Sequence, residues 1–255
     1  MSSPVNVARV RTVKPTRTPG DRLTAPPAKV SAEECSKAHL ILRYAHDTCN
    51  SMLTIFRQSL RTRGQERGSP RGAPTDEQMD LLRAMLVFAG AGLDSMLKQL
   101  IRDALPALSR VDEKVAEGFK TFATRRLRPS QPDGEDDTGH KLLAAAMISD
   151  SPRETILEAY VQDLIRGSLQ SASELSRSTA ALGFQGMLST YGHLAEAFRV
   201  RNQIIHELDI NFSHATRNRQ TRALVDMVQL SDEILRVAAH ILVLTDEQLA
   251  KPDGD

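Results

Sequence analysis

The chain has 255 residues, of which 40% are hydrophobic and 25% are charged, a composition typical of a globular protein and not of a disordered one. The net charge of +1 excludes a uniformly basic surface but not a local basic patch, and without tryptophan the chain has few rings on which RNA bases could stack. We expect neither a membrane span nor a secretory signal, and therefore a cytoplasmic protein, because no apolar run approaches about 18 residues and the first residues are polar and basic.

Residues 1–30 read as a disordered basic tail. They carry six basic residues against one acid, together with five prolines. Nothing in them repeats with the period of a strand or a helix. Such an arm either contacts RNA or is a solvated leader, and its lack of aromatic residues favours the leader.

Two long helices are predicted after this tail. The first has the capping-box pair Ser31 and Glu34 and apolar residues at intervals of three and four, and it should end near Leu60. Residues 61–74 are rich in glycine, proline and arginine and are expected to form a loop. The second helix should begin at the pair Thr75 and Gln78 and end at Pro106.

The glycines and cysteines within these helices lead to two further predictions. Gly90 and Gly92 each cost about 1 kcal/mol relative to alanine, so they indicate a close helix approach or a kink. Cys35 and Cys49 would lie about 21 Å apart on one helix, too far for a disulfide, and two cysteines provide no zinc site.

The remaining chain also has helical periodicity. Ser151, Pro152 and Glu154 form a strong helix start, and Gly183 fits a helix stop. No segment alternates with the period of a strand. We therefore expect an all-α bundle of about six to eight helices over residues 31–249, followed by a polar tail over 250–255. Further predicted elements are a short helix through 111–122, an acidic loop at 130–139, one or two turns at 140–148, and helices at 152–182, 187–205 and 224–244.

Residues 199–210 (RVRNQIIHELDI) hold the one constellation with evident chemistry. On a continuous helix Asn202 and His206 share a face, while Arg201 lies about 140° from His206 and can reach the same anion with its long side chain. A histidine can exchange a proton with a ribose 2′-hydroxyl or a leaving 5′-oxygen, and a guanidinium can stabilise charge on the phosphorus oxygens. The alternative is structural: a histidine that caps the helix and arginines in solvent.

The stretch Arg201-Asn202-x-x-x-His206, flanked by Ile204 and Ile205, resembles the Arg-x(4–6)-His motif of HEPN (higher eukaryote and prokaryote nucleotide-binding) domains. Residues 91–100 (AGLDSMLKQL) and 168–175 (SLQSASEL) resemble the branch named for ribonuclease-L-like defence nucleases. The resemblance spans about residues 35–245. It implies an all-α bundle, a homodimer that joins two motifs, and metal-independent endoribonuclease activity that needs no cofactor.

The same resemblance implies further partners and roles. Such proteins act as toxins or in antiphage defence, so an inhibitory antitoxin or a defence-system partner is expected beside the RNA substrate. Inactive members of the family bind or scaffold, and a non-catalytic scaffold or a nucleotide- or RNA-binding module is therefore the alternative. Arg201 and His206 are the catalytic candidates, and Asn202 matches the polar position that follows the arginine.

Several charged residues could support this site. Asp94 would orient Arg201 or pair with Lys98, and Glu207 and Asp209 would steer the imidazole or face water. A basic cluster close to the motif could bind an RNA backbone or simply be solvated. Its members are Arg199, Arg217, Arg219 and Arg222.

Overall fold

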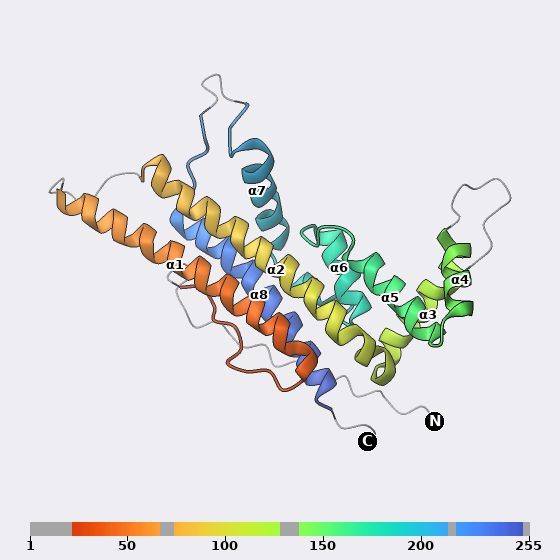
Figure 1. The fold of residues 1–255 in the computed structure, drawn as a ribbon. Coiled ribbons are helices and arrows are strands. Elements are labelled where there is room, and N and C mark those ends of the chain that lie inside the picture. Colours follow the sequence, from red (N-terminus) through yellow and green to blue (C-terminus); the bar gives the residue numbers. More distant parts are fainter. Residues whose placement is uncertain (1–21, 67–73, 128–137, 214–217, 252–255) are drawn as a thin grey trace, which may run out of the picture.

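The computed structural model describes residues 22–66, 74–127, 138–213 and 218–251. In this part of the chain eight α-helices and two short 3-10 helices form, and extended backbone pairs only in an isolated bridge between Ile210 and Arg219 (Figure 1). The prediction of an all-α bundle is confirmed. In chain order the elements are η1 (Glu33–Cys35), α1 (Ser36–Glu66), α2 (Asp76–Val111), α3 (Glu113–Arg126), α4 (Thr138–Ile148), α5 (Pro152–Ile165), α6 (Ala172–Ala181), η2 (Met187–Thr190), α7 (Leu194–Glu207) and α8 (Leu224–Leu249).

The three longest helices, α1, α2 and α8, lie side by side and form the core (Figure 1). Helix α1 is antiparallel to α2, because the Cys49 thiol donates to the Met85 carbonyl at 3.4 Å while Lys37, near the start of α1, pairs with Asp103 at 3.4 Å. The faces that meet are apolar. Their fully buried side chains include Leu42, Leu53 and Phe56 of α1, Leu86, Leu93, Leu97 and Leu100 of α2, and Ile234, Ile241 and Leu242 of α8.

Gly92 sets the distance between α1 and α2. A Cβ atom at this position would lie 2.3 Å from the Cβ of Ala45, far inside van der Waals contact. The expected close helix approach is therefore confirmed at Gly92. Gly90 has a different neighbour, Arg201 of α7, whose Nε would lie 3.6 Å from a Cβ atom there.

Both long helices continue beyond their predicted ends. Helix α1 reaches Glu66, and its last turns are tied to the start of α2 because Gln78 donates to the Ser59 hydroxyl at 3.2 Å and accepts from Arg63 at 3.3 Å. Pro106 lies inside α2 and does not end it. Leu105 and Leu108 on either side are fully buried, and this burial offsets the hydrogen bond that proline cannot donate.

Some of the predicted helix caps form in the structure and others do not. Thr75 and Gln78 form the expected capping box, with bonds of 3.3 and 2.9 Å. Ser31 does not cap α1, which begins at Ser36, and its N–H donates instead to Asp246 at 2.7 Å. Ser151 precedes α5 without a side-chain capping bond, whereas Gly183 has the left-handed φ of 92° expected for a stop after α6.

Residues 22–32 form an ordered strap, although the sequence assigned most of them to a disordered tail. Thr24 hydrogen-bonds through its N–H and hydroxyl to Asp232, and the N–H groups of Ser31 and Ala32 both donate to Asp246 at 2.7 Å. The strap therefore runs parallel to α8. His39 of α1 bonds the Pro27 carbonyl at 2.8 Å from the other side, so the strap is fixed to two helices.

Helices α3 to α6 form a smaller group beside the C-terminal half of α2 (Figure 1). Asp112 ends α2 and caps α3 by accepting from the Val115 N–H at 3.0 Å. Tyr160 of α5 packs on Phe122 of α3, with ring centroids 4.8 Å apart. The break between α5 and α6 falls at residues 166–171, where a continuous helical register was expected.

The two cysteines are free and buried, as expected for a pair that cannot form a disulfide. Burial raises the pKa of the Cys49 thiol to about 12, and burial with the charges of Asp246 and Glu34 raises that of Cys35 to about 12. Both thiols are therefore protonated and unreactive at neutral pH.

Among the described residues, α2 is the one helix long and apolar enough to cross a membrane by length and composition. More than half of its most apolar stretch is buried inside the molecule. Burial of this kind is also found in the central helix of a globular core.

Candidate functional site

Helix α7 carries the arginine–histidine motif across one face of α2. Phe198, Val200 and Ile204 are buried, and they fix α7 against the core. On α2, Arg83 bonds Asp209, two residues after α7, and Gly90 lies against Arg201 in the middle of α7. Because positions 83 and 90 lie two turns apart on one face of a helix, α7 runs antiparallel to α2.

Arg201 is the half-buried cation of the site. Its side chain lies against Gly90, and its Nη1 donates to the Asn202 amide oxygen at 3.0 Å. Burial lowers the pKa of Arg201, while the nearby charge of Asp94 raises it. Its buried Nε has no hydrogen-bond partner among the described residues. The protein covers this Nε, so a ligand from solvent could meet only the terminal Nη groups of the guanidinium.

Asp94 is held in place by two other groups. Its Oδ1 accepts from the Leu169 N–H at 2.7 Å, and its Oδ2 pairs with Lys98 at 3.0 Å. The predicted pairing with Lys98 is confirmed. Asp94 acts on Arg201 through its charge, and it also fixes the segment between α5 and α6 beside α2.

His206 lies in the last turn of α7 and is exposed to solvent. The helix ends one residue later, where Leu208 takes the left-handed φ of 51°. Five helical residues separate His206 from Arg201, about 7.5 Å along the axis and 140° around it. Within one chain the imidazole and the guanidinium therefore point in different directions, although both are within reach of solvent.

Asp209, two residues after α7, is fully buried between two arginines. Its carboxylate accepts from the Nε of Arg83 at 2.9 Å and from Arg222 at 2.5 and 3.1 Å. Asp209 also has a left-handed φ of 60°. All of its acceptor capacity is used within the protein, so Asp209 anchors the end of α7 to α2 and α8 and does not steer the imidazole.

The predicted basic cluster is divided by its ion pairs. Arg222 is committed to Asp209 and to the Gln203 amide oxygen at 3.0 Å. Arg219 pairs with Asp80 at 2.6 Å, and although partial burial raises the pKa of Asp80, Arg219 and Arg83 lower it overall. Arg199 is exposed and meets Glu196 at 3.6 Å. Arg217 lies outside the described residues.

Glu207 is exposed, beside a group of exposed apolar side chains at the end of α7. These side chains are Ile205, Leu208 and Phe212, which are 36%, 64% and 62% exposed. Apolar groups that gather in this way on a surface often belong to a contact with another chain.

Arg83 and Gln203 belong to the framework of the site, and sequence reasoning missed both. Arg83 is only 3% exposed and donates to Asp209, to Asp80 at 3.0 Å and to the Gln220 carbonyl at 2.9 Å. Its position in the apolar register of α2, between Leu82 and Leu86, is the signal that could have revealed it. A charge at a core position predicts a buried partner elsewhere in the chain.

A cavity of about 320 Å³ lies between the start of α7 and the start of α8. His193, Glu196 and Arg222 are among the residues that line it, whereas Arg201 and His206 are not. Among the described residues no three histidine, cysteine, aspartate or glutamate side chains gather in a way that could hold a metal ion.

Comparison of the chain with models of known families, with curated proteins and with solved structures gives no match. The resemblance to HEPN domains therefore rests on the residues quoted for it.

Proposed function

We propose that this protein is a metal-independent endoribonuclease of the toxin or antiphage-defence type, acting in the cytoplasm as a homodimer. The observation that carries the proposal is the state of Arg201. It is a half-buried guanidinium held by the Asn202 amide, on the same helix as the exposed imidazole of His206. A guanidinium at the edge of solvent is suited to a phosphate oxygen.

The chemistry needs one base, one acid and one stabilising cation. His206 takes the proton from the ribose 2′-hydroxyl, whose oxygen attacks the adjacent phosphorus. The bond from phosphorus to the 5′-oxygen breaks, and the partner's His206 gives that oxygen a proton. Arg201 stabilises the charge on the phosphorus oxygens, and Asn202 positions its guanidinium. The products carry a 2′,3′-cyclic phosphate and a 5′-hydroxyl.

In the proposed site a second copy completes the catalytic group, because the two side chains leave α7 in different directions. His206 and Arg201 lie about 140° apart on α7, so a composite site requires a group from another subunit. The exposed Ile205, Leu208 and Phe212 lie within six residues of His206 in the sequence and would supply apolar area for a contact between two such helix ends.

Cleavage of total RNA by the purified protein in the presence of a chelator tests the proposal. The wild type should cut RNA, and His206→Ala should lower the rate by about 10²- to 10⁴-fold, the usual contribution of general acid–base catalysis. Arg201→Ala should lower the rate by about 10²- to 10³-fold, as expected for loss of a transition-state donor. Phosphate end-group analysis should find the cyclic phosphate.

His193→Ala is the matched control, because His193 is an exposed histidine at the other end of α7. This variant should cut RNA at the wild-type rate. Deoxyribose at the cut site should stop the reaction, since the attacking hydroxyl is then missing. Equal cleavage by wild type and His206→Ala would refute the assignment.

The alternative is a non-catalytic scaffold or RNA-binding module. It predicts an intact fold and no cleavage by any variant, and it predicts that growth arrest on expression survives His206→Ala. An active nuclease would harm its own cell, so an inhibitory antitoxin or a defence-system partner belongs to the proposed function.

A further inference from the structure

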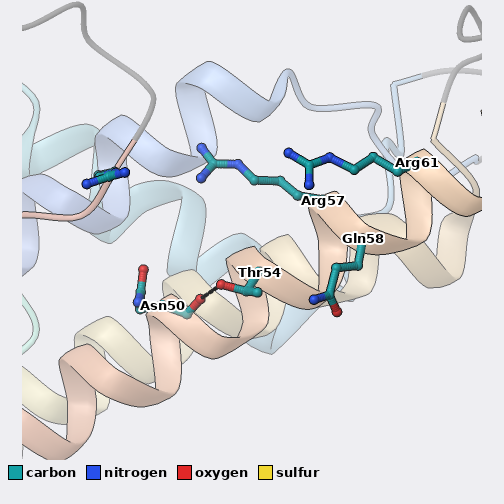
Figure 2. Close-up of a pocket in the computed structure, with 6 residues that line it drawn as sticks. Asn50, Thr54, Arg57, Gln58 and Arg61 are labelled. Atoms are coloured by element: carbon teal, nitrogen blue, oxygen red, sulfur yellow. Dashed lines mark hydrogen bonds between the residues drawn. The ribbon is translucent and has the colours of Figure 1, made fainter.

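Helix α1 carries a row of cationic and amide side chains that the proposed active site does not use. They line an open cavity of about 410 Å³ together with a residue of the strap (Figure 2). We call this cavity the arginine groove. Its lining residues are Arg22, Asn50, Thr54, Arg57, Gln58 and Arg61.

The spacing of these residues makes the groove long and one-sided. The row from Asn50 to Arg61 covers about 16 Å of helix axis. Its members Asn50, Thr54, Arg57 and Arg61 follow one another at intervals of three or four residues and so share one face, and Gln58 lies next to Arg57. Arg57 and Arg61 extend in the same direction, one behind the other (Figure 2). The opposite face of α1 is buried in the core through Leu53 and Phe56. The row therefore stands on a rigid support.

The strap supplies the third guanidinium. Arg22 lies two residues before Thr24, and Thr24 is hydrogen-bonded to Asp232 of α8. Charges therefore come to the groove from two elements, α1 and the strap. Arg57 is partly buried and the other five lining residues are exposed, so the groove is open to a partner from solvent.

The groove and the sequence beside it are strongly positive, although the whole chain has a net charge of only +1. Three arginines and no carboxylate are among its lining residues in the described chain. The sequence after Arg61 adds Arg63, Arg67 and Arg71 against one acid, Glu66. Positive charge that is concentrated in one region of a protein attracts an anionic partner.

We propose that the arginine groove binds the phosphodiester backbone of a single nucleic-acid strand. Guanidinium groups pair with phosphate oxygens through two donors, and hydroxyl and amide side chains also contact phosphates. No aromatic or apolar side chain is among the lining residues, so the groove has no place for the base of a free nucleotide. A row of cations about 6 Å apart along α1 fits repeated phosphates better than one.

The groove lies at the same end of the bundle as the arginine–histidine motif. Ser59 lies between Arg57 and Arg61 in the sequence of α1, and its hydroxyl accepts from Gln78 of α2 at 3.2 Å. Arg83, about 7.5 Å further along α2, donates to Asp209 after α7. The choice of RNA as the natural strand rests on the proposed function, whereas binding of the backbone does not.

Binding of a fluorescent single-stranded DNA to the full chain tests the groove apart from catalysis, because DNA has no 2′-hydroxyl to attack. The double variant Arg57→Gln, Arg61→Gln should lower the slope of log affinity against log salt by about 1.4, or 0.7 for each lost phosphate contact. If the two proteins have equal affinity for DNA at 1 M salt, this difference in slope makes the double variant bind about 25-fold more weakly at 0.1 M salt.

The matched control is Arg43→Gln, Arg125→Gln, which removes two exposed arginines outside the groove and leaves the same net charge. This control should keep the wild-type slope. Equal losses in the two double variants would overturn the proposal, as would competition by polyglutamate as effective as that of DNA at equal charge. If the wild type binds DNA as expected but His206→Ala still cuts RNA, the proposed function is refuted and the groove is not. If the variant Arg57→Gln, Arg61→Gln binds DNA like the wild type, the groove is refuted and the proposed function is not.

Discussion

At the scale of single residues, the most consequential group is a carboxylate that the sequence placed in a supporting role. Asp209 is fully buried and accepts from Arg83 and Arg222. The end of α7 is therefore fixed by a cluster of buried charges. His206 lies three residues before this anchor, and its position depends on it.

Replacement of Asp209 tests this anchor. Asp209→Ala leaves the Arg83 guanidinium buried with one partner fewer, and we expect a loss of about 3–5 kcal/mol in the free energy of unfolding. Asp209→Asn should cost less, because its amide oxygen still accepts one of these bonds. Urea denaturation measures both values.

Glu207→Ala is the control for this prediction. Glu207 is exposed and lies two residues from Asp209, so its removal should change the free energy of unfolding by no more than about 0.5 kcal/mol. Similar losses in the alanine variants of Glu207 and Asp209 would show that the buried cluster is not the anchor.

The sequence could not reveal these pairs because they join distant parts of the chain. Arg201, Asn202 and His206 were found because they lie within one helical segment. Arg83 and Asp209 are 126 residues apart, so no local pattern connects them. The basic character of Arg219 and Arg222 was evident, but their carboxylate partners are visible only in the folded chain.

At the scale of the elements, two glycines of α2 have opposite roles. Gly92→Ala would place a methyl group 2.3 Å from the Cβ of Ala45, and we expect overpacking to cost about 1–3 kcal/mol. Gly90→Ala meets Arg201 at an ordinary 3.6 Å, and we expect a gain of up to about 1 kcal/mol from helix propensity.

Thermal and urea unfolding of the two variants measure this difference. Each variant is the control for the other, because both make the same change in one helix two residues apart. Equal effects on stability would contradict the close approach of α1 and α2 at Gly92.

The ends of helices were less predictable than their existence. Thr75 and Gln78 form a local capping pair, and local chemistry was sufficient to place the start of α2. Pro106 signalled an end that burial of its neighbours overrides. Ser31 had the right spacing for a cap, but Asp246 of α8 bonds its N–H instead, and this contact spans 215 residues.

At the scale of the whole molecule, the proposed dimer is the feature on which catalysis depends. Leu208→Asn with Phe212→Asn removes exposed apolar area beside His206, and asparagine tolerates the left-handed φ of residue 208. We expect this variant to be monomeric by light scattering and to lose RNA cleavage. The wild type should be a dimer.

Leu40→Gln is the control for the dimer, since Leu40 is 48% exposed on α1, away from the end of α7. It should leave both mass and cleavage unchanged. A monomeric wild type that cuts RNA would contradict the composite site.

The strap also gives the molecule an order of assembly. Thr24 bonds to Asp232, 208 residues later in the chain, so this contact forms only after the chain has been synthesised beyond Asp232, in the first half of α8. Until then the strap is tied to α1 through the bond between His39 and Pro27 but lacks its contact with α8, two residues after Arg22. A nascent chain still on the ribosome, surrounded by RNA, therefore lacks the complete groove, and full strength of binding arrives only with the finished polypeptide.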